Sequence, residues 1–258
     1  MTALRAKANS QARPAPRLDV HNSDVPAICR ACESRHKGIC GSLSPDQLVQ
    51  LSKHTSKQTY ASQAELVGVG DDVHSYSNIL SGVVKLTKLM SDGRQQIVGL
   101  QFAPDFLGRI YSNTSNCTAE AATNVRVCSF PKTVLEEIIR NAPGLEHALH
   151  EQALRELDEA RDWMLTLGRK TASEKVASFL YLIASHIDPE VETDDVRSVQ
   201  FELPLKRAEI ADFLGLTIET VSRQLTKLRK ERIIEIENNR MVSVRSLDRL
   251  LAACEIET

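Results

Sequence analysis

Three cysteines lie close together near the start of the chain, Cys29, Cys32 and Cys40 in the run CRACESRHKGIC. A fourth thiol is available far along the sequence, at Cys117 or Cys128. Thiolates bind zinc and iron-sulfur clusters, and pairs of thiols form redox-sensitive disulfides. The cysteine pattern therefore predicts a metal centre or a redox switch.

The spacing of these cysteines separates the candidate centres poorly. Cys29, Cys32, His36 and Cys40 approximate a zinc knuckle, which needs no distant ligand, although the intervals of two, three and three residues depart from the usual knuckle. A disulfide between Cys29 and Cys32, or between Cys32 and Cys40, is the metal-free alternative. A cubane iron-sulfur cluster needs four thiolates, and this run supplies three of them.

The composition limits the kind of protein that such a centre could belong to. The 258 residues exceed one typical domain, and a hydrophobic fraction of 42% is enough for two cores. Lys and Arg number 32 against 34 Asp and Glu, so binding to a polyanion requires a local basic patch. The chain has no membrane-length apolar run and no secretion signal in residues 1–28, so we expect a cytoplasmic protein with no membrane partner. In that reducing compartment, cysteines favour metal or redox chemistry over structural disulfides.

The first half of the chain has a sequence pattern typical of a small antiparallel β-roll. Residues 1–28 are polar and predict a flexible lead-in. Ser44 and Pro45 begin a short helix to about residue 54. Short strands with glycine turns then follow, among them a hairpin of residues 83–90 and 94–102. A helix within residues 131–144, ending at Pro143 and Gly144, closes this unit.

A long helix is predicted from Leu145 to about Lys170. Apolar residues recur along it at alternating spacings of four and three, as in a coiled-coil seam: Ala153, Leu157, Ala160, Met164 and Leu167. So short a repeat fits a dimer seam and an ordinary amphipathic helix about equally. Trp163 and Leu165 lie off the seam and could face the chain's own core. A further helix over residues 172–187 and an acidic exit loop over 188–198 follow.

The carboxy-terminal part has the pattern of a winged helix. One apolar face (Ile210, Ala211, Leu214), a turn glycine (Gly215) and a second apolar face (Leu216, Val221, Leu225) predict a helix-turn-helix. Strands over residues 233–237 and 241–245, joined at Asn238 and Asn239, predict the wing, because Asn tolerates positive φ.

The second helix of this motif carries the side chains that could read DNA. Thr217 is its natural N-cap, and the residues exposed at its start and along its outer face are Glu219, Thr220, Ser222, Arg223 and Lys227. Arg can donate two hydrogen bonds to guanine, and Glu can accept one from cytosine. Further basic residues at 229, 230 and 232 suit phosphate contacts. The alternative is a solvated helix on which Glu219 and Arg223 merely pair with each other.

A strand roll, a long helix and a winged helix in that order, with ETVSR at residues 219–223, resemble the CRP/FNR superfamily of bacterial transcription regulators. The resemblance covers nearly the whole chain. The cysteine run, with seven residues between Cys32 and Cys40, is similar to the FNR branch and looks like its FnrL/FnrN type. The fold it implies is α+β: a cysteine-rich loop (1–41), an antiparallel, cupin-like β-roll (42–143), a dimerisation helix (144–171) and a winged helix-turn-helix (172–258).

The resemblance also implies a function. It assigns Cys29, Cys32, Cys40 and Cys128 to a [4Fe-4S] cluster. It implies base contacts from Glu219, Ser222 and Arg223 to inverted TTGAT-type half-sites in double-stranded DNA. The expected protein is an oxygen-responsive regulator of anaerobic and microaerobic genes that works as a homodimer with RNA polymerase. In this hypothesis the cluster holds the roll against the long helix and so favours the dimer, and oxygen removes that support.

The resemblance makes a cyclic-nucleotide sensor the nearest rival. Such sensors carry a Gly-Glu pair and then an Arg-Ser pair in the roll. Here the matching stretches read FLGR at residues 106–109 and NCT at 116–118, so both the Glu and the Arg are missing and no cyclic nucleotide is expected. No phosphate-binding glycine loop, nucleophile elbow or recognisable pair of catalytic carboxylates is present, so we expect no enzyme.

Overall fold

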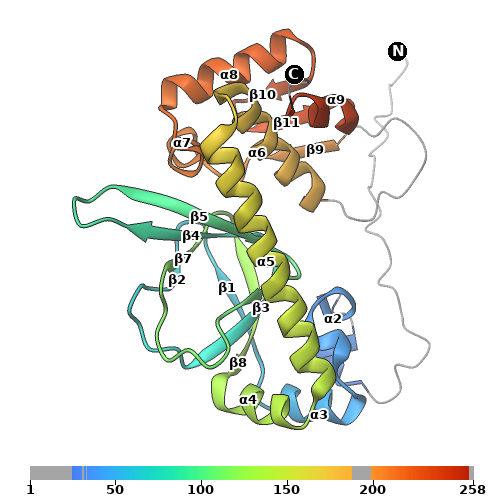
Figure 1. The fold of residues 1–258 in the computed structure, drawn as a ribbon. Coiled ribbons are helices and arrows are strands. Elements are labelled where there is room, and N and C mark those ends of the chain that lie inside the picture. Colours follow the sequence, from blue (N-terminus) through green and yellow to red (C-terminus); the bar gives the residue numbers. More distant parts are fainter. Residues whose placement is uncertain (1–24, 31, 33, 188–198, 256–258) are drawn as a thin grey trace, which may run out of the picture.

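The computed structural model describes residues 25–30, 32, 34–187 and 199–255. The predicted lead-in over residues 1–24 and the predicted exit loop over 188–198 lie outside the described residues. Within them the chain has an antiparallel β-roll, a long helix and a helix-turn-helix domain, which confirms the predicted α+β class (Figure 1). None of the described helices combines the length and apolar character that crossing a membrane requires.

The described residues of the cysteine segment, which spans 27–42, form short helical turns and not the predicted loop. These turns are α1 (Ala27–Arg30), α2 (Ser34–Lys37) and η2 (Ile39–Ser42). The next helix, α3 (Pro45–Ser52), begins as predicted, because the Ser44 hydroxyl accepts a hydrogen bond from the Gln47 N–H while the Gln47 side chain accepts one from the Ser44 N–H.

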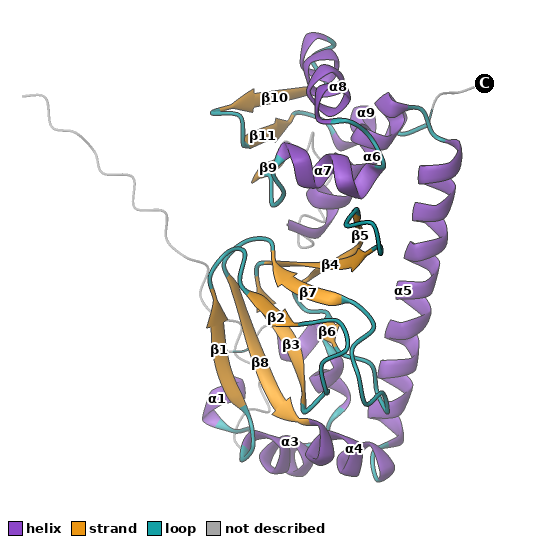
Figure 2. Cartoon of the chain, turned by 90° about the vertical axis from the view of Figure 1, so that its left-hand side faces the viewer, coloured by secondary structure: helices purple, strands orange, loops and turns teal. Residues whose placement is uncertain are grey.

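The roll consists of two four-stranded antiparallel sheets. One has the order β1-β8-β3-β6 and the other β2-β7-β4-β5 (Figure 2). Their bounds are β1 (Ser56–Tyr60), β2 (Glu65–Val67), β3 (Ser75–Ser81), β4 (Val83–Leu89), β5 (Gln95–Phe102), β6 (Phe106–Leu107), β7 (Thr118–Ala121) and β8 (Val125–Pro131). Side chains from both sheets form a common core: Ile79, Val84, Ala119, Ala121, Val125 and Val127. The predicted hairpin of residues 83–90 and 94–102 is confirmed, because β4 and β5 pair in antiparallel fashion.

Two helices follow the roll, and the boundary between them differs from the prediction. The closing helix α4 (Lys132–Arg140) ends before Pro143, and α5 (Pro143–Arg169) begins at that proline. A proline fits the first turn of a helix, where no N–H partner is needed, so it starts α5 and does not terminate α4. In Figure 1, α5 runs the length of the molecule from α4 to the carboxy-terminal domain.

The predicted seam of α5 is exposed. Leu157 is 45% and Met164 73% accessible, and Ala153, Ala160 and Leu167 are exposed as well. Trp163 packs on Phe213 with ring centroids 4.5 Å apart, as predicted for a residue facing the chain's own core. Leu165 does not share that environment, because 59% of it is exposed, so that prediction was wrong.

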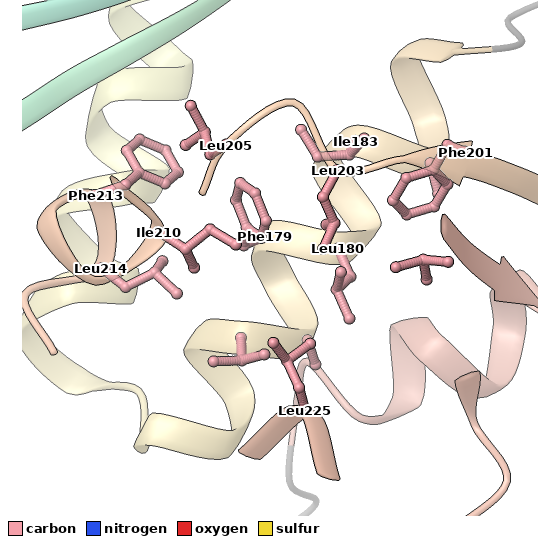
Figure 3. Close-up of a cluster of buried hydrophobic side chains, with 14 of the residues drawn as sticks. Phe179, Leu180, Ile183, Phe201, Leu203, Leu205, Ile210, Phe213, Leu214 and Leu225 are labelled. Carbon is pink, nitrogen blue, oxygen red and sulfur yellow. The ribbon is translucent and has the colours of Figure 1, made fainter. Parts of the chain in front are cut away.

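The reading head, residues 172–187 and 199–255, contains α6 (Ala172–Ile187), β9 (Val199–Glu202), α7 (Arg207–Leu214), α8 (Ile218–Lys230), β10 (Ile234–Glu237), β11 (Met241–Val244) and α9 (Leu247–Ala252). Gly215 has φ 61° between α7 and α8, and Asn238 and Asn239 have positive φ in the wing turn, which confirms both predicted turns. The sequence prediction missed β9, which pairs with β11. Figure 3 shows the apolar core that holds these elements together.

Candidate metal centre and nucleic-acid interface

The structure brings the four predicted cysteine ligands into one neighbourhood. Cys29 lies in α1, Cys32 between α1 and α2, Cys40 in η2 and Cys128 in the middle of β8. The thiol of Cys40 lies within electrostatic range of the other three, and that of Cys128 within range of Cys29 and Cys32. All four are free thiols that are partly buried.

Asn78 is the link between the cysteine segment and the roll. It lies on β3 directly opposite Cys128 of β8, and its buried side chain donates a hydrogen bond from Nδ2 to the Cys40 sulfur over 3.1 Å. The cysteine segment also contacts α5 through η2 and β3 through α2. The cysteines therefore lie where the roll, the amino-terminal turns and the long helix meet.

The surroundings keep three of these thiols protonated in the absence of a cation. Burial first, and then the three nearby thiols, raise the pKa of Cys40 to about 12, against the smaller lowering effect of the Asn78 hydrogen bond. Burial likewise raises the pKa of Cys128 to about 11. It also raises the pKa of Cys29, and the Cys32 thiol adds to that effect. Because several thiolates would repel one another here, a bound cationic centre is what would stabilise them together.

Four thiols are the donor set that a [4Fe-4S] cluster requires, so the residue types and their number fit the group. Their sulfur atoms do not form a coordination shell: in the described part of the chain, no three His, Cys, Asp or Glu side chains make up a group that could hold a metal ion. His36, the fourth ligand of the zinc alternative, has an exposed side chain. The fold thus supplies a neighbourhood of donors, and binding a cluster would require the thiols to close around it.

The two remaining cysteines lie elsewhere. Cys117 has Lys88 and Arg109 as its electrostatic neighbours and none of the four clustered thiols. Cys254 is buried in the reading head, where its thiol donates to the Leu250 carbonyl over 3.2 Å. The structure therefore groups Cys128, and not Cys117, with the amino-terminal cysteines.

A cavity of about 500 Å³ lies in the roll. Its lining includes Gly108, Arg109, Asn116 and Cys117, which belong to the stretches that correspond to the ligand-binding pairs of cyclic-nucleotide sensors. A side chain at position 108 would collide with the Tyr76 ring, since a Cβ there would lie 2.4 Å from a ring carbon. The absence of a cyclic nucleotide remains a prediction, because the cavity itself is present.

The outer face of α8 carries the predicted DNA-reading residues. The Thr217 hydroxyl accepts a hydrogen bond from the Thr220 N–H, which caps the helix. The side chains of Glu219, Ser222 and Arg223 are exposed, as is that of Lys227, while Thr220 is half-buried against its cap. In the described residues no ion pair joins Glu219 to Arg223, so the structure does not support the alternative that these two merely pair with each other.

The sequence prediction named Arg229 for phosphate contacts but missed the basic groove beside this face to which it belongs. The groove has a volume of about 470 Å³ and includes Lys206, Arg207, Ser222, Thr226, Arg229 and Arg240 in its lining. Arg207 donates from Nη2 to the Asn239 carbonyl over 3.0 Å, and its buried Nη1 has no partner among the described residues. A phosphate oxygen would satisfy such a donor. The KR pair at residues 206 and 207 was a further sequence signal for it, beside Arg229.

Two family models match the chain. Residues 57–142 match the cyclic nucleotide-binding domain, and residues 174–253 match the Crp-like helix-turn-helix domain. The two matches correspond to the roll with α4 and to most of the reading head.

Whole-chain relatives cover the region between them. A protein described as "Probable transcriptional activator" from Rhizobium leguminosarum bv. viciae is 52% identical over 91% of this chain and 96% of its own length. The transcriptional activator protein FnrL of Cereibacter sphaeroides is 38% identical over 88% of this chain and 93% of its own. Among solved structures, FixK2 from Bradyrhizobium japonicum superimposes with a TM-score of 0.69 at 30% identity, over 79% of this chain and 99% of its own.

Proposed function

The chain belongs to the CRP/FNR family of DNA-binding transcription regulators, and we propose that within this family it is an oxygen-responsive activator that carries a [4Fe-4S] cluster. Its relatives are regulators and not enzymes, as the sequence predicted. The observation that carries the proposal is the approach of Cys128, from the middle of a β-strand, to the three cysteines of the amino-terminal turns.

Cys29, Cys32, Cys40 and Cys128 would hold the cluster. When bound, it supplies an oxygen-labile link among four thiolates. The chain's own part is to connect that link to the long helix: η2 contacts α5, and Asn78 ties Cys40 to the strand opposite Cys128. Tightening or loosening the cysteine segment would therefore change how the roll lies against α5.

Dimerisation would translate that change into DNA binding. The seam residues of α5 are exposed in the described chain, which is what an unpaired coiled-coil face requires. A second copy covering this seam would present two α8 helices to successive major grooves, about one helical turn apart. Because each copy reads one half-site, loss of the dimer would forfeit half of the base contacts.

Glu219, Ser222 and Arg223 would contact base edges in inverted TTGAT-type half-sites, while Thr220 and Lys227 would support them at the backbone. Burial of a DNA phosphate against Arg207 would add affinity without sequence preference. As an activator bound to a promoter, the protein would meet RNA polymerase, and it would act in the cytoplasm where the chromosome lies.

The test is the metal content of anaerobically purified protein. Four irons and four acid-labile sulfides per chain, with a visible absorption band that bleaches in air, are the expected result. One zinc per chain would redirect the proposal to a zinc-binding regulator. No metal, with an air-dependent disulfide among the same cysteines, would redirect it to a thiol switch.

A further inference from the structure

The reading head is attached to the long helix by a very short connection. Helix α5 ends at Arg169 and α6 begins at Ala172, and Lys170 between them has the extended dihedrals φ −72° and ψ 146°. Two residues of non-helical backbone cannot fix a direction by themselves, since rotation about a few bonds would swing the whole head. The orientation of the head must therefore be set by its contacts with the rest of the chain.

Apolar contacts supply part of that interface. The hairpin β4–β5 and the helices of the reading head share one buried cluster, in which Val83, Ile97, Leu100 and Phe102 come from the roll. Phe102 also stacks on His186 of α6 with ring centroids 4.3 Å apart. Such contacts hold surfaces together, but the hydrophobic effect is non-directional and specifies orientation weakly.

A buried ion triad crosses the same interface. Lys85 of β4 lies directly opposite Glu120 of β7, and its ammonium is 2.8 Å from Glu120 Oε1 and 2.5 Å from Glu209 Oε1 of α7. The three side chains are 8%, 26% and 12% exposed. Burial of the ammonium is outweighed by the two carboxylates, so the pKa of Lys85 lies above its ordinary value. Buried ion pairs contribute little net stability, and their best-attested use is to specify one arrangement.

Glu209 connects this triad to the start of the helix-turn-helix. Its other oxygen, Oε2, accepts a hydrogen bond from the Lys206 backbone N–H over 2.7 Å. The Lys206 ammonium donates to Gln63 Oε1 of the roll, also over 2.7 Å. Farther along α7, Gln95 Nε2 donates to Asp212 Oδ2 over 2.9 Å. The roll thus contacts the start of α7 through an ion pair and hydrogen bonds, and contacts it again farther along through the hydrogen bond to Asp212.

These contacts leave the DNA-reading face free. They engage α7, whereas Glu219, Ser222 and Arg223 on α8 are exposed. Figure 2 shows α7 facing the end of β5, with α8 farther from the roll. The interface therefore leaves these three side chains accessible in the arrangement seen.

We propose that Lys85, with Glu120 and Glu209, is a positioning residue that sets the angle of the reading head on the long helix, and thereby the distance between the half-sites that a dimer can read. This inference rests on the proposed function, because it requires a dimer on inverted half-sites. Lys85 touches no DNA in this scheme. It acts through the orientation of α7, so its removal should affect the choice of spacing more than the affinity for one half-site.

The experiment measures dissociation constants for three DNA duplexes: an inverted TTGAT repeat with the preferred spacer, the same repeat with the spacer lengthened by two base pairs, and a single half-site. The variants are Lys85→Met, which removes the ammonium, and Glu209→Gln, which keeps an oxygen for the Lys206 N–H. Lys88→Met is the matched control, because Lys88 lies on the same strand, is exposed and forms no ion pair with a described residue.

We expect both variants to lower the ratio of the dissociation constant for the lengthened spacer to that for the preferred spacer by about tenfold, equivalent to ~1.4 kcal/mol. The affinity for the single half-site should stay within about twofold of the wild-type value. Lys88→Met should keep the wild-type ratio. Wild-type spacer preference in both Lys85→Met and Glu209→Gln overturns the inference. An equal loss on all three duplexes also overturns it, because that pattern indicates a damaged head. A wild-type protein with no preference for inverted repeats overturns the proposed function, and the inference falls with it.

Discussion

The cysteine centre and the reading head reach their geometry by opposite routes. In the reading head, every residue predicted to contact a base lies on α8, and the order along the sequence is the order on the helix. In the cysteine centre, Cys29, Cys32 and Cys40 come from one short amino-terminal segment, but Cys128 comes from the middle of a distant strand. The head is locally encoded, whereas the centre exists only when the roll has folded.

This difference has a physical consequence for function. A helix presents its outer face whenever its cap and apolar side are in place, so base-reading residues need little from the rest of the chain. A centre assembled from two distant segments changes whenever their relative position changes. In the proposed function, the cysteine centre is therefore the region suited to sensing, and the head is the region suited to a constant reading function.

The largest expected effect is at the distant ligand. Cys128→Ser should abolish cluster loading and with it anaerobic operator binding, as should Cys32→Ser, because a cubane needs four thiolates. Iron and sulfide assays and operator binding under anaerobic conditions measure both effects. Cys117→Ser is the matched control and should keep its iron. Full iron in Cys128→Ser, with loss in Cys117→Ser, would make Cys117 the fourth ligand instead.

The next largest effect is expected at the seam that would connect the two regions. Leu157→Glu places a charge where a second copy would bury it, which costs several kcal/mol, so the dimer should dissociate. Sedimentation of the cluster-loaded protein measures this, and operator affinity should fall by about tenfold or more. Leu154→Glu is the control, because Leu154 is exposed at 52% but lies off the seam. Equal behaviour of both variants would contradict a seam at Leu157.

A smaller effect is expected in the reading head itself. Arg223→Ala should cost ~1–3 kcal/mol of operator binding and relax the preference for one base pair. Arg229→Ala, in the basic groove, should instead weaken binding to all sequences. It should also reduce the slope of the logarithm of the binding constant against the logarithm of salt concentration by about one. Iron content should match wild type in both, since neither residue lies near the cysteines. A loss of iron in either variant would contradict the view that the reading head and the cysteine centre are structurally independent.

The smallest expected effect tests local encoding by the backbone. Gly215 has φ 61° and no atom within 4 Å of an added Cβ, so Gly215→Ala should cost ~1 kcal/mol through strain alone. Gly168→Ala is the control, because Gly168 lies within helix α5 with equally open space and no positive φ, and alanine favours a helix. Thermal melting should show a slightly lower Tm for the first and an equal or higher Tm for the second.

Much of the fold was predictable because its signals are local. Ser44 with Pro45 predicted the start of α3, Gly215 predicted the turn between α7 and α8, and the two asparagines predicted the wing turn. The errors were also local in kind. Pro143 was interpreted as an end when its lack of an N–H suits a helix start, and Leu165 was placed in a core that its position on α5 does not reach.

The sequence by itself determined most of the elements, the apolar faces and the set of thiols available to a metal, because helix periodicity, caps and turn residues act over a few neighbours. It pointed to Cys128 only through resemblance. Tertiary structure decided which thiols share a neighbourhood, that Asn78 links them to the roll, and that Lys85 lies buried between Glu120 and Glu209. Those contacts join residues far apart in the chain, and their formation depends on strand register and domain packing, which no local pattern specifies.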